Sequence, residues 1–135
     1  AQKVGVCFHV GSQCMHPDAY RIAIRMTRDL ISQLNFEIDS INIGGGFPSI
    51  YPGLIPPPLE QYFEAIDEEF AILKAYRPNM QLLSEPGRAL VAESTSLVVQ
   101  VLLRKGNTLY INDGIYGAMF DAGFPKLIFL LYSRQ

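Results

Sequence analysis

Short hydrophobic runs alternate along the chain with longer segments whose apolar residues recur every three or four positions. The short runs, residues 4–9, 38–43 and 80–83, have the length and composition of β-strands. The longer segments, residues 17–34 and 59–77, have the spacing of amphipathic helices. Because parallel strands are joined by helical crossovers, this order predicts a parallel sheet or barrel with helices outside it.

The pattern changes near residue 93, where the helical spacing ends. Residues 94–103 and 108–112 predict a β-hairpin around Lys105-Gly106-Asn107, and residues 127–132 predict another strand. A complete (β/α)8 barrel takes about 250 residues, so the 135 residues of this chain hold only part of one. We therefore predict an α/β fold in which residues 1–92 form the closing, C-terminal part of a barrel and residues 93–135 the first strands of a β domain. The chain begins directly in a strand, which is typical of an internal fragment.

Composition and charge narrow the class of protein. Hydrophobic residues make up 49% of the chain and charged residues 18%, which is enough apolar side chain for a packed core. The 11 basic and 13 acidic residues lack the basic excess that nucleic acid or an anionic membrane requires. No apolar stretch approaches the roughly 20 residues that span a bilayer. The cysteines, Cys7 and Cys14, form neither a disulfide framework nor a metal-ligand pattern, so we expect no metal and a cytoplasmic location.

The candidate functional residues follow the three predicted strands of residues 1–92. In parallel β/α folds the carboxyl ends of the strands meet at one edge, where ligands bind. Three consecutive glycines can turn their N–H groups toward an anion, and an arginine adds a planar guanidinium suited to phosphate. The sequence therefore predicts a phosphate ligand. The candidate residues are His9, Ser12, Gly44, Gly45, Gly46, Glu85, Gly87 and Arg88.

Each of these residues also has a structural explanation when it is taken alone. The glycines can simply turn the chain, and Arg88 can be a solvated surface charge. Glu85 can pair with Arg88, and His9 can be a hydrogen-bonded core residue. Their combination at one edge favours a ligand instead, because a phosphate site, an aromatic ring and a carboxylate suit pyridoxal 5'-phosphate.

The same segments carry a resemblance to a known family. FHVGSQC, INIGGGFP, SEPGR and YINDGIYG occur in this order, and the chain resembles the pyridoxal-phosphate-dependent ornithine/diaminopimelate/arginine decarboxylases, most closely the ornithine decarboxylases. The resemblance implies fold type III, an alanine-racemase-like (β/α)8 barrel followed by a β-sandwich domain. It also implies a homodimer with shared active sites.

The resemblance further implies roles for the site residues. His9 would stack on the pyridine ring of the cofactor, and Glu85 would pair with the ring nitrogen. The three glycines, Ser12, Gly87 and Arg88 would hold the phosphate. A carboxylate at the ring nitrogen keeps the ring protonated, and a protonated ring withdraws the electrons released when the substrate carboxylate leaves as CO2.

The residues that recognise the substrate are less well defined. Asp113 and Tyr116 match a segment near the dimer interface and the substrate pocket, although a polar turn with a packed tyrosine explains them equally well. In the eukaryotic ornithine decarboxylases an aspartate binds the distal amine of the substrate, and an ungapped alignment puts Pro125 at that position. Asp121 is a candidate for this charge, or else a surface loop residue.

Together these patterns predict decarboxylation of a basic amino acid. The reaction that fits them best converts L-ornithine to putrescine in polyamine biosynthesis. Lysine, arginine and diaminopimelate stay open as substrates, as does a racemase of the same barrel type. A non-catalytic homologue that binds a partner protein, as the antizyme inhibitors do, is a further alternative, and His9, Glu85 and Arg88 count against it. The four lysines follow no predicted barrel strand. We therefore expect the Schiff-base lysine, and a downstream cysteine-aspartate pair, outside this chain.

Overall fold

The structure is a computed structural model that describes residues 3–120. It divides into two compact units. The first runs to residue 92 without residues 51–53, and those three residues group with the second unit, which starts at residue 93. The strand predicted at residues 127–132, together with Asp121 and Pro125, lies outside the described residues.

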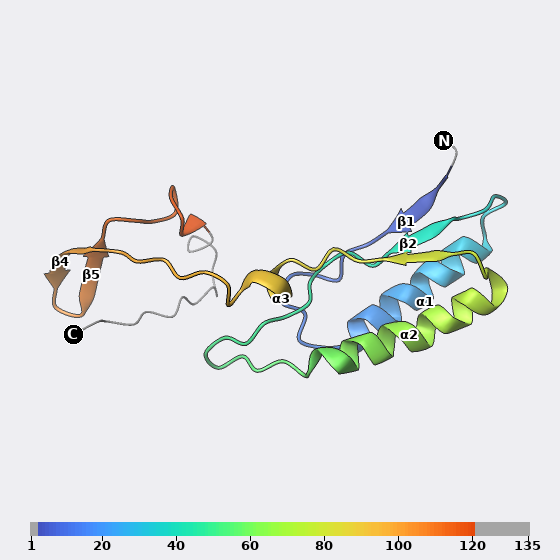
Figure 1. The fold of residues 1–135 in the computed structure, drawn as a ribbon, viewed down its shortest axis with the longest axis horizontal. Helices are drawn as coiled ribbons and strands as arrows, with labels where there is room; N and C mark the ends of the chain where they lie inside the picture. Colours follow the sequence, from blue (N-terminus) through green and yellow to red (C-terminus); the bar gives the residue numbers. More distant parts are fainter. Residues whose placement is uncertain (1–2, 121–135) are drawn as a thin grey trace. The chain divides into compact units, whose positions relative to one another are not determined.

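The first unit is a three-stranded parallel sheet with two long helices on one face (Figure 1). Its strands are paired in the order β1-β2-β3, with Val6 beside Ile41 and Ile41 beside Leu82. This confirms the predicted alternation of strands and helices and the parallel pairing. The elements are β1 (Gly5–Cys7), α1 (Asp18–Ser32), β2 (Ser40–Asn42), α2 (Leu59–Tyr76), β3 (Gln81–Leu83) and α3 (Arg88–Val91).

Two details of the first unit differ from the prediction. Each strand has three residues and is shorter than its hydrophobic run, because regular pairing starts one or two residues after the run begins and, in β1 and β2, ends before the run does. The helix α3 was not predicted. Its residues favour a helix, but four positions are too few for a helical period to show in the sequence.

The core of this unit lies between the sheet and the two long helices. Leu30 of α1 and Phe63 of α2 also follow the helical spacing of apolar residues, but they are 48% and 50% exposed. The buried apolar residues that form the core cluster are Tyr20, Ile24, Ile31, Ile38, Ile41, Ile43, Phe47, Tyr62, Ile66, Leu73 and Met80.

A buried carboxylate that pairs with partly exposed arginines joins α1 to α2 beside this core. The Glu69 side chain is 2% exposed, and its Oε1 lies 2.6 Å from Nη2 of Arg25 while its Oε2 lies 3.3 Å from Nη1 of Arg28. Arg21 also pairs with α2, through Glu68, whose side chain is 65% exposed. The hydrogen bond from Arg25 holds the pKa of Glu69 below its usual value, so the buried carboxylate stays ionised at neutral pH.

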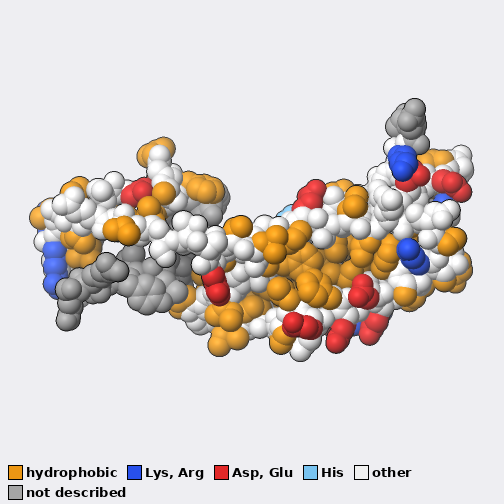
Figure 2. Space-filling model, viewed as in Figure 1, with side chains coloured by type: hydrophobic (Ala, Val, Ile, Leu, Met, Phe, Trp, Pro, Cys, Tyr) orange, Lys and Arg blue, Asp and Glu red, His pale blue; other side chains and the backbone are white. Residues whose placement is uncertain are grey.

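The outer face of α1 keeps an apolar stripe that this unit does not cover. Ile22, Met26 and Leu30 recur every four positions and are 56%, 67% and 48% exposed. Figure 2 shows that large hydrophobic side chains are exposed on both units. No helix within residues 3–120 is long and apolar enough to cross a membrane.

The second unit contains an antiparallel hairpin of β4 (Val101–Lys105) and β5 (Thr108–Ile111). Gly106 begins its two-residue turn with a φ of +55°, a conformation that glycine adopts without strain. This confirms the predicted hairpin, but the prediction that its first strand begins at residue 94 is wrong. β5 has only four residues, and within residues 3–120 no strand pairs with residues 94–100 in regular register. The Gln100 N–H donates to the Asn112 side chain at 2.8 Å.

Candidate functional site

The carboxyl ends of the three strands bring the predicted site residues together. Backbone hydrogen bonds continue past the strands, from Phe8 N–H to the Asn42 carbonyl at 3.0 Å and from Ile43 N–H to the Leu83 carbonyl at 2.9 Å. One residue further, the Glu85 N–H donates to the Gly44 carbonyl at 2.8 Å. The loops that contain His9, the glycine triplet and Glu85 are therefore neighbours at one edge of the sheet.

The three glycines are required by a close approach of these loops. Gly44 and Gly46 have φ values of +67° and +102°, which other residues rarely adopt. A Cβ added to Gly44 would overlap the Phe8 carbonyl oxygen, one added to Gly45 the Glu85 carbonyl oxygen, and one added to Gly46 the Gly11 carbonyl oxygen. The triplet thus does more than turn the chain, because it lets three backbones meet.

All three carbonyl groups of the triplet accept hydrogen bonds. Those of Gly44 and Gly46 accept from the backbone N–H of Glu85 and of Cys14, both at 2.8 Å, and that of Gly45 accepts from the Tyr20 hydroxyl at 2.9 Å.

The N–H groups of the triplet are used differently. The Gly44 N–H donates to Asn42 Oδ1 at 2.9 Å. Within residues 3–120, the N–H groups of Gly45 and Gly46 have no hydrogen-bond partner. In a trans peptide the carbonyl and the N–H point in opposite directions. These two N–H groups therefore point away from the groups that bind the carbonyls, and they are the open, unpartnered donors of the triplet within residues 3–120.

Tyr20 supports the triplet from the core. Its ring is fully buried and stacks on Phe47, with ring centroids 4.9 Å apart. Burial raises the pKa of the Tyr20 hydroxyl, so the group stays protonated and donates to Gly45. Tyr62 meets the Tyr20 ring edge-on and donates its own hydroxyl to the Cys14 carbonyl at 2.7 Å.

His9 lies at the end of β1 and is exposed, so the alternative of a core histidine is wrong. Its Nδ1 accepts the Gly11 N–H at 2.9 Å, which assigns the proton of the neutral ring to Nε2. A Cβ added to Gly45 would lie 3.8 Å from this Nε2, so the imidazole lies close to the glycine triplet. Ser12 follows Gly11 in the same loop and is exposed.

Glu85 is exposed at the end of β3 and accepts a hydrogen bond from Asn42. The bond joins Asn42 Nδ2 to Glu85 Oε1 over 3.0 Å. The partner of this carboxylate is thus Asn42, which the sequence did not single out; the alternative from the sequence was an ion pair with Arg88. The available signal was an amide side chain between the apolar residues Ile41 and Ile43, two positions before the glycine triplet.

Arg88 begins α3 and is partly buried, and its carbonyl accepts the Ser49 hydroxyl at 3.3 Å. A Cβ added to Gly87 would meet no atom within 4 Å, so a ligand has room to approach this backbone. Gln13 links the neighbouring loop, because its side-chain amide bonds both the N–H and the carbonyl of Ser49. Gln13 has a φ of +55° and was not among the residues predicted from the sequence.

Comparison with known proteins identifies the family that uses this arrangement. A family model described as "Pyridoxal-dependent decarboxylase, pyridoxal binding domain" matches residues 2–92, more than half of the chain. The chain belongs to the pyridoxal-dependent decarboxylases. This confirms the family and the pyridoxal phosphate cofactor that the motifs predicted.

The similar proteins include decarboxylases and an antizyme inhibitor. Ornithine decarboxylase of Schizosaccharomyces pombe is 34% identical, over 90% of this chain and 29% of its own length. Antizyme inhibitor 2 of Xenopus laevis is 31% identical, over 93% of this chain and 32% of its own. The lysine/ornithine decarboxylase of Vibrio vulnificus, solved with cadaverine, is 30% identical with a TM-score of 0.79 over 93% of this chain and 35% of that one. The chain spans about a third of the length of these relatives.

The described residues fit the cofactor of this family. Pyridoxal phosphate carries a basic ring nitrogen and a phosphate. The site offers a carboxylate, Glu85, and the open N–H groups of Gly45 and Gly46 at the same edge of the sheet. Lys3 precedes β1 and Lys74 lies near the C-terminal end of α2, so both are at the opposite edge of the sheet from this site.

The predicted substrate residues lie in the second unit or beyond the described residues. Asp113 accepts the N–H groups of Gly114 at 2.6 Å and Ala118 at 3.0 Å, and so caps a turn after β5. Tyr116 is fully exposed, which rules out the alternative of a packed tyrosine. Asp121 is outside the described range.

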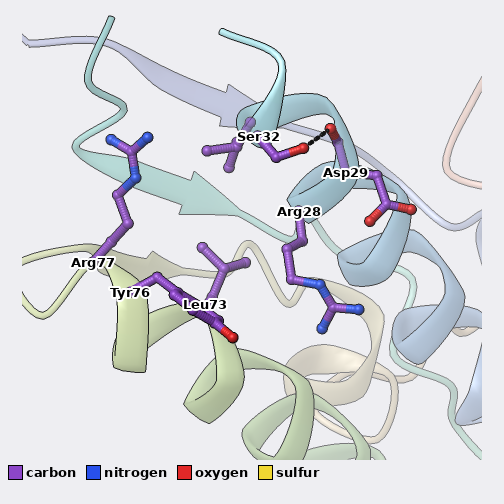
Figure 3. Close-up of a pocket in the computed structure, with 7 residues that line it drawn as sticks. Arg28, Asp29, Ser32, Leu73, Tyr76 and Arg77 are labelled. Carbon is purple, nitrogen blue, oxygen red and sulfur yellow. Dashed lines mark hydrogen bonds between the residues drawn. The ribbon is translucent and has the colours of Figure 1, made fainter. Parts of the chain in front are cut away.

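Two hollows lie at the other end of the first unit. One of about 380 Å³ is lined by Arg28 and Ser32 of α1 and by Leu73 and Tyr76 of α2 (Figure 3). The other, of about 500 Å³, includes Phe36. The helices run antiparallel to the strands, so these hollows face the amino ends of the strands. They contain none of the candidate cofactor residues.

Proposed function

We propose that the full-length protein catalyses the decarboxylation of a basic amino acid, L-ornithine, and releases putrescine. The observation that carries this proposal is the position of Glu85, an exposed carboxylate held by Asn42 at the end of β3, beside His9 and the open N–H groups of the glycine triplet. Relatives at 31–34% identity named ornithine decarboxylase support L-ornithine as the substrate.

Each site residue has a task in this reaction. When bound, pyridoxal phosphate supplies a ring that accepts the electron pair left by the departing carboxylate. Glu85 holds a proton at the ring nitrogen, which the ring needs for that task. His9 packs against the ring. Binding of the phosphate falls to Ser12, Gly44, Gly45, Gly46, Gly87 and Arg88.

The proposal extends to the assembly of the protein. Residues 1–92 form the closing part of an alanine-racemase-like barrel, and residues 93–135 form the first strands of a β-sandwich domain. The exposed stripe of Ile22, Met26 and Leu30 on α1 supports this, because a further helix of a barrel would cover it. We further propose a cytoplasmic homodimer with shared active sites, in which Asp113, Tyr116 and Asp121 contribute to the substrate pocket or the dimer interface.

An assay of CO2 release tests the reaction. The full-length protein, loaded with pyridoxal phosphate, is given L-ornithine, L-lysine, L-arginine, diaminopimelate and the neutral L-norleucine at equal concentrations. We expect the highest kcat/KM with L-ornithine and almost none with L-norleucine, because an apolar side chain leaves the carboxylate for the distal amine unpaired. A higher kcat/KM with L-lysine or L-arginine would contradict L-ornithine as the substrate but would still support decarboxylation as the reaction.

Cofactor binding is tested separately with Arg88→Ala. A charge-assisted contact to phosphate contributes about 1.5–3 kcal/mol, so we expect the Kd for pyridoxal phosphate to rise about tenfold or more. Arg104→Ala is the matched control, because Arg104 lies in the β4 strand and donates to the Gly106 carbonyl. Equal Kd values for the two variants would remove Arg88 from the phosphate site.

A second candidate function follows from the similarity to antizyme inhibitor 2. In that case the protein would act by binding a partner protein and would release no CO2 from any amino acid in the panel. Failure of the wild-type protein both to bind pyridoxal phosphate in a titration and to release CO2 would favour this second function.

A further inference from the structure

Asn42 connects two parts of the candidate site through one side chain. Its Nδ2 donates to Glu85 Oε1 at 3.0 Å, and its Oδ1 accepts the Gly44 N–H at 2.9 Å. Because one end of the amide must donate and the other must accept, the two bonds fix which way the amide points.

The backbone of Asn42 is held as firmly as its side chain. It is the last residue of β2, the central strand of the sheet, and pairs with Cys7 of β1 on one side and Leu83 of β3 on the other. Its carbonyl accepts the Phe8 N–H at 3.0 Å. The donor that reaches Glu85 therefore stands on a strand that is paired on both sides.

We propose that Asn42 is a positioning residue for Glu85. It holds Oε1, so that Oε2 stays directed to the proton on the ring nitrogen of the cofactor. This inference rests on the proposed function, in which Glu85 pairs with that nitrogen.

The chemistry of the amide suits this task. Glu85 is exposed in the described structure, and a carboxylate without a fixed donor samples several rotamers. An arginine or lysine at position 42 would also fix the carboxylate but would compete with the ring nitrogen for its charge. A neutral amide orients Glu85 and leaves that charge for the cofactor.

The variant Asn42→Ala tests the inference in the full-length protein. We expect kcat with L-ornithine to fall about tenfold, since a hydrogen bond to a charged group is lost. We also expect the ring nitrogen of bound ¹⁵N-labelled pyridoxal phosphate to shift toward its unprotonated position in the NMR spectrum. Asn79→Ala, an exposed asparagine before β3, should change neither value.

A double-mutant cycle separates an effect through Glu85 from a general effect on the glycine loop. If Asn42 acts through Glu85, adding Asn42→Ala to Glu85→Gln changes neither kcat nor the ¹⁵N shift further. If the two substitutions instead lower kcat additively, Asn42 acts through Gly44 and the inference is overturned. Wild-type kcat and ¹⁵N shift in Asn42→Ala would overturn it as well. An inactive wild-type protein would instead contradict the proposed function.

Discussion

The hydrogen bond from Tyr20 to the glycine triplet offers a sharp test of how the site is built. Tyr20 is fully buried, and its hydroxyl donates to the Gly45 carbonyl at 2.9 Å. Tyr20→Phe removes this oxygen and keeps the ring, so the stacking on Phe47 stays. Because Gly45 is itself buried, water cannot easily replace the lost donor.

The size of the effect follows from the burial of both partners. A net hydrogen bond contributes about 0.5–1.5 kcal/mol, and an unpaired buried acceptor costs about 1–3 kcal/mol. We therefore expect Tyr20→Phe to lower the free energy of unfolding by about 1–3 kcal/mol. Burial raises the pKa of Tyr20, so the stability that its protonated form contributes is complete below the unfolded value near 10 and is lost only at higher pH. The difference between the two proteins should thus be constant from pH 6 to about pH 9.

Urea unfolding of the full-length protein measures this difference. Tyr76→Phe is the matched control, because Tyr76 is 80% exposed, and it should change the free energy of unfolding by less than about 0.5 kcal/mol. A titration with pyridoxal phosphate should also show weaker binding by Tyr20→Phe. The Gly45 carbonyl and the Gly46 N–H belong to one planar peptide group. Loss of the hydrogen bond to the carbonyl therefore lets the whole peptide group rotate, including the N–H. If Tyr20→Phe were as stable as Tyr76→Phe, the hydrogen bond would not support the loop.

Two further substitutions test the packing around the site. Glu69→Gln should lower the free energy of unfolding at pH 7 by about 1–2 kcal/mol, a moderate value because its partner Arg25 is 54% exposed and screened by water. Arg25 lowers the pKa of Glu69 in the folded protein. The extra stability of the wild type is therefore complete above the pKa that this carboxyl group has in the unfolded chain. Urea titrations should show it vanish as the pH falls through the pKa of the folded state. Gly46→Ala should weaken pyridoxal phosphate binding and stability more than Gly53→Ala. Both glycines have positive φ, but only at Gly46 does an added methyl group meet another backbone, so equal urea midpoints would contradict the close approach.

The long helices could be predicted because their signals are local. Pro58 and Pro78 flank α2, and Asp18 opens α1 after Pro17, so both helices start or stop where proline chemistry requires. The positions of the strands could be predicted but their lengths could not, because a hydrophobic run does not show at which residue a strand stops pairing with its neighbour. Residues 94–100 show this most clearly, since no strand among residues 3–120 pairs with them.

Site residues could be predicted from the sequence only where the topology of the fold alone sets their position. His9 and Glu85 follow parallel strands, and the fold brings such residues to one edge. Tyr20, Gln13 and Asn42 were not selected, because their hydrogen bonds join residues 25, 36 and 43 positions apart. No local pattern encodes contacts of that range. Glu69 escaped prediction for the same reason, since its arginines lie on the other helix.

The glycine triplet and Glu85 carry different information about function. Gly44 and Gly46 have positive φ and lie against neighbouring backbones, so the fold requires them whether or not the protein is an enzyme. Glu85 is exposed, and within residues 3–120 its side chain bonds only Asn42, so packing gives no reason for a carboxylate there. A homologue that only binds a partner protein needs the fold and could lose this charge. Glu85, and not the glycine motif, therefore distinguishes a decarboxylase from a relative that only binds a partner protein.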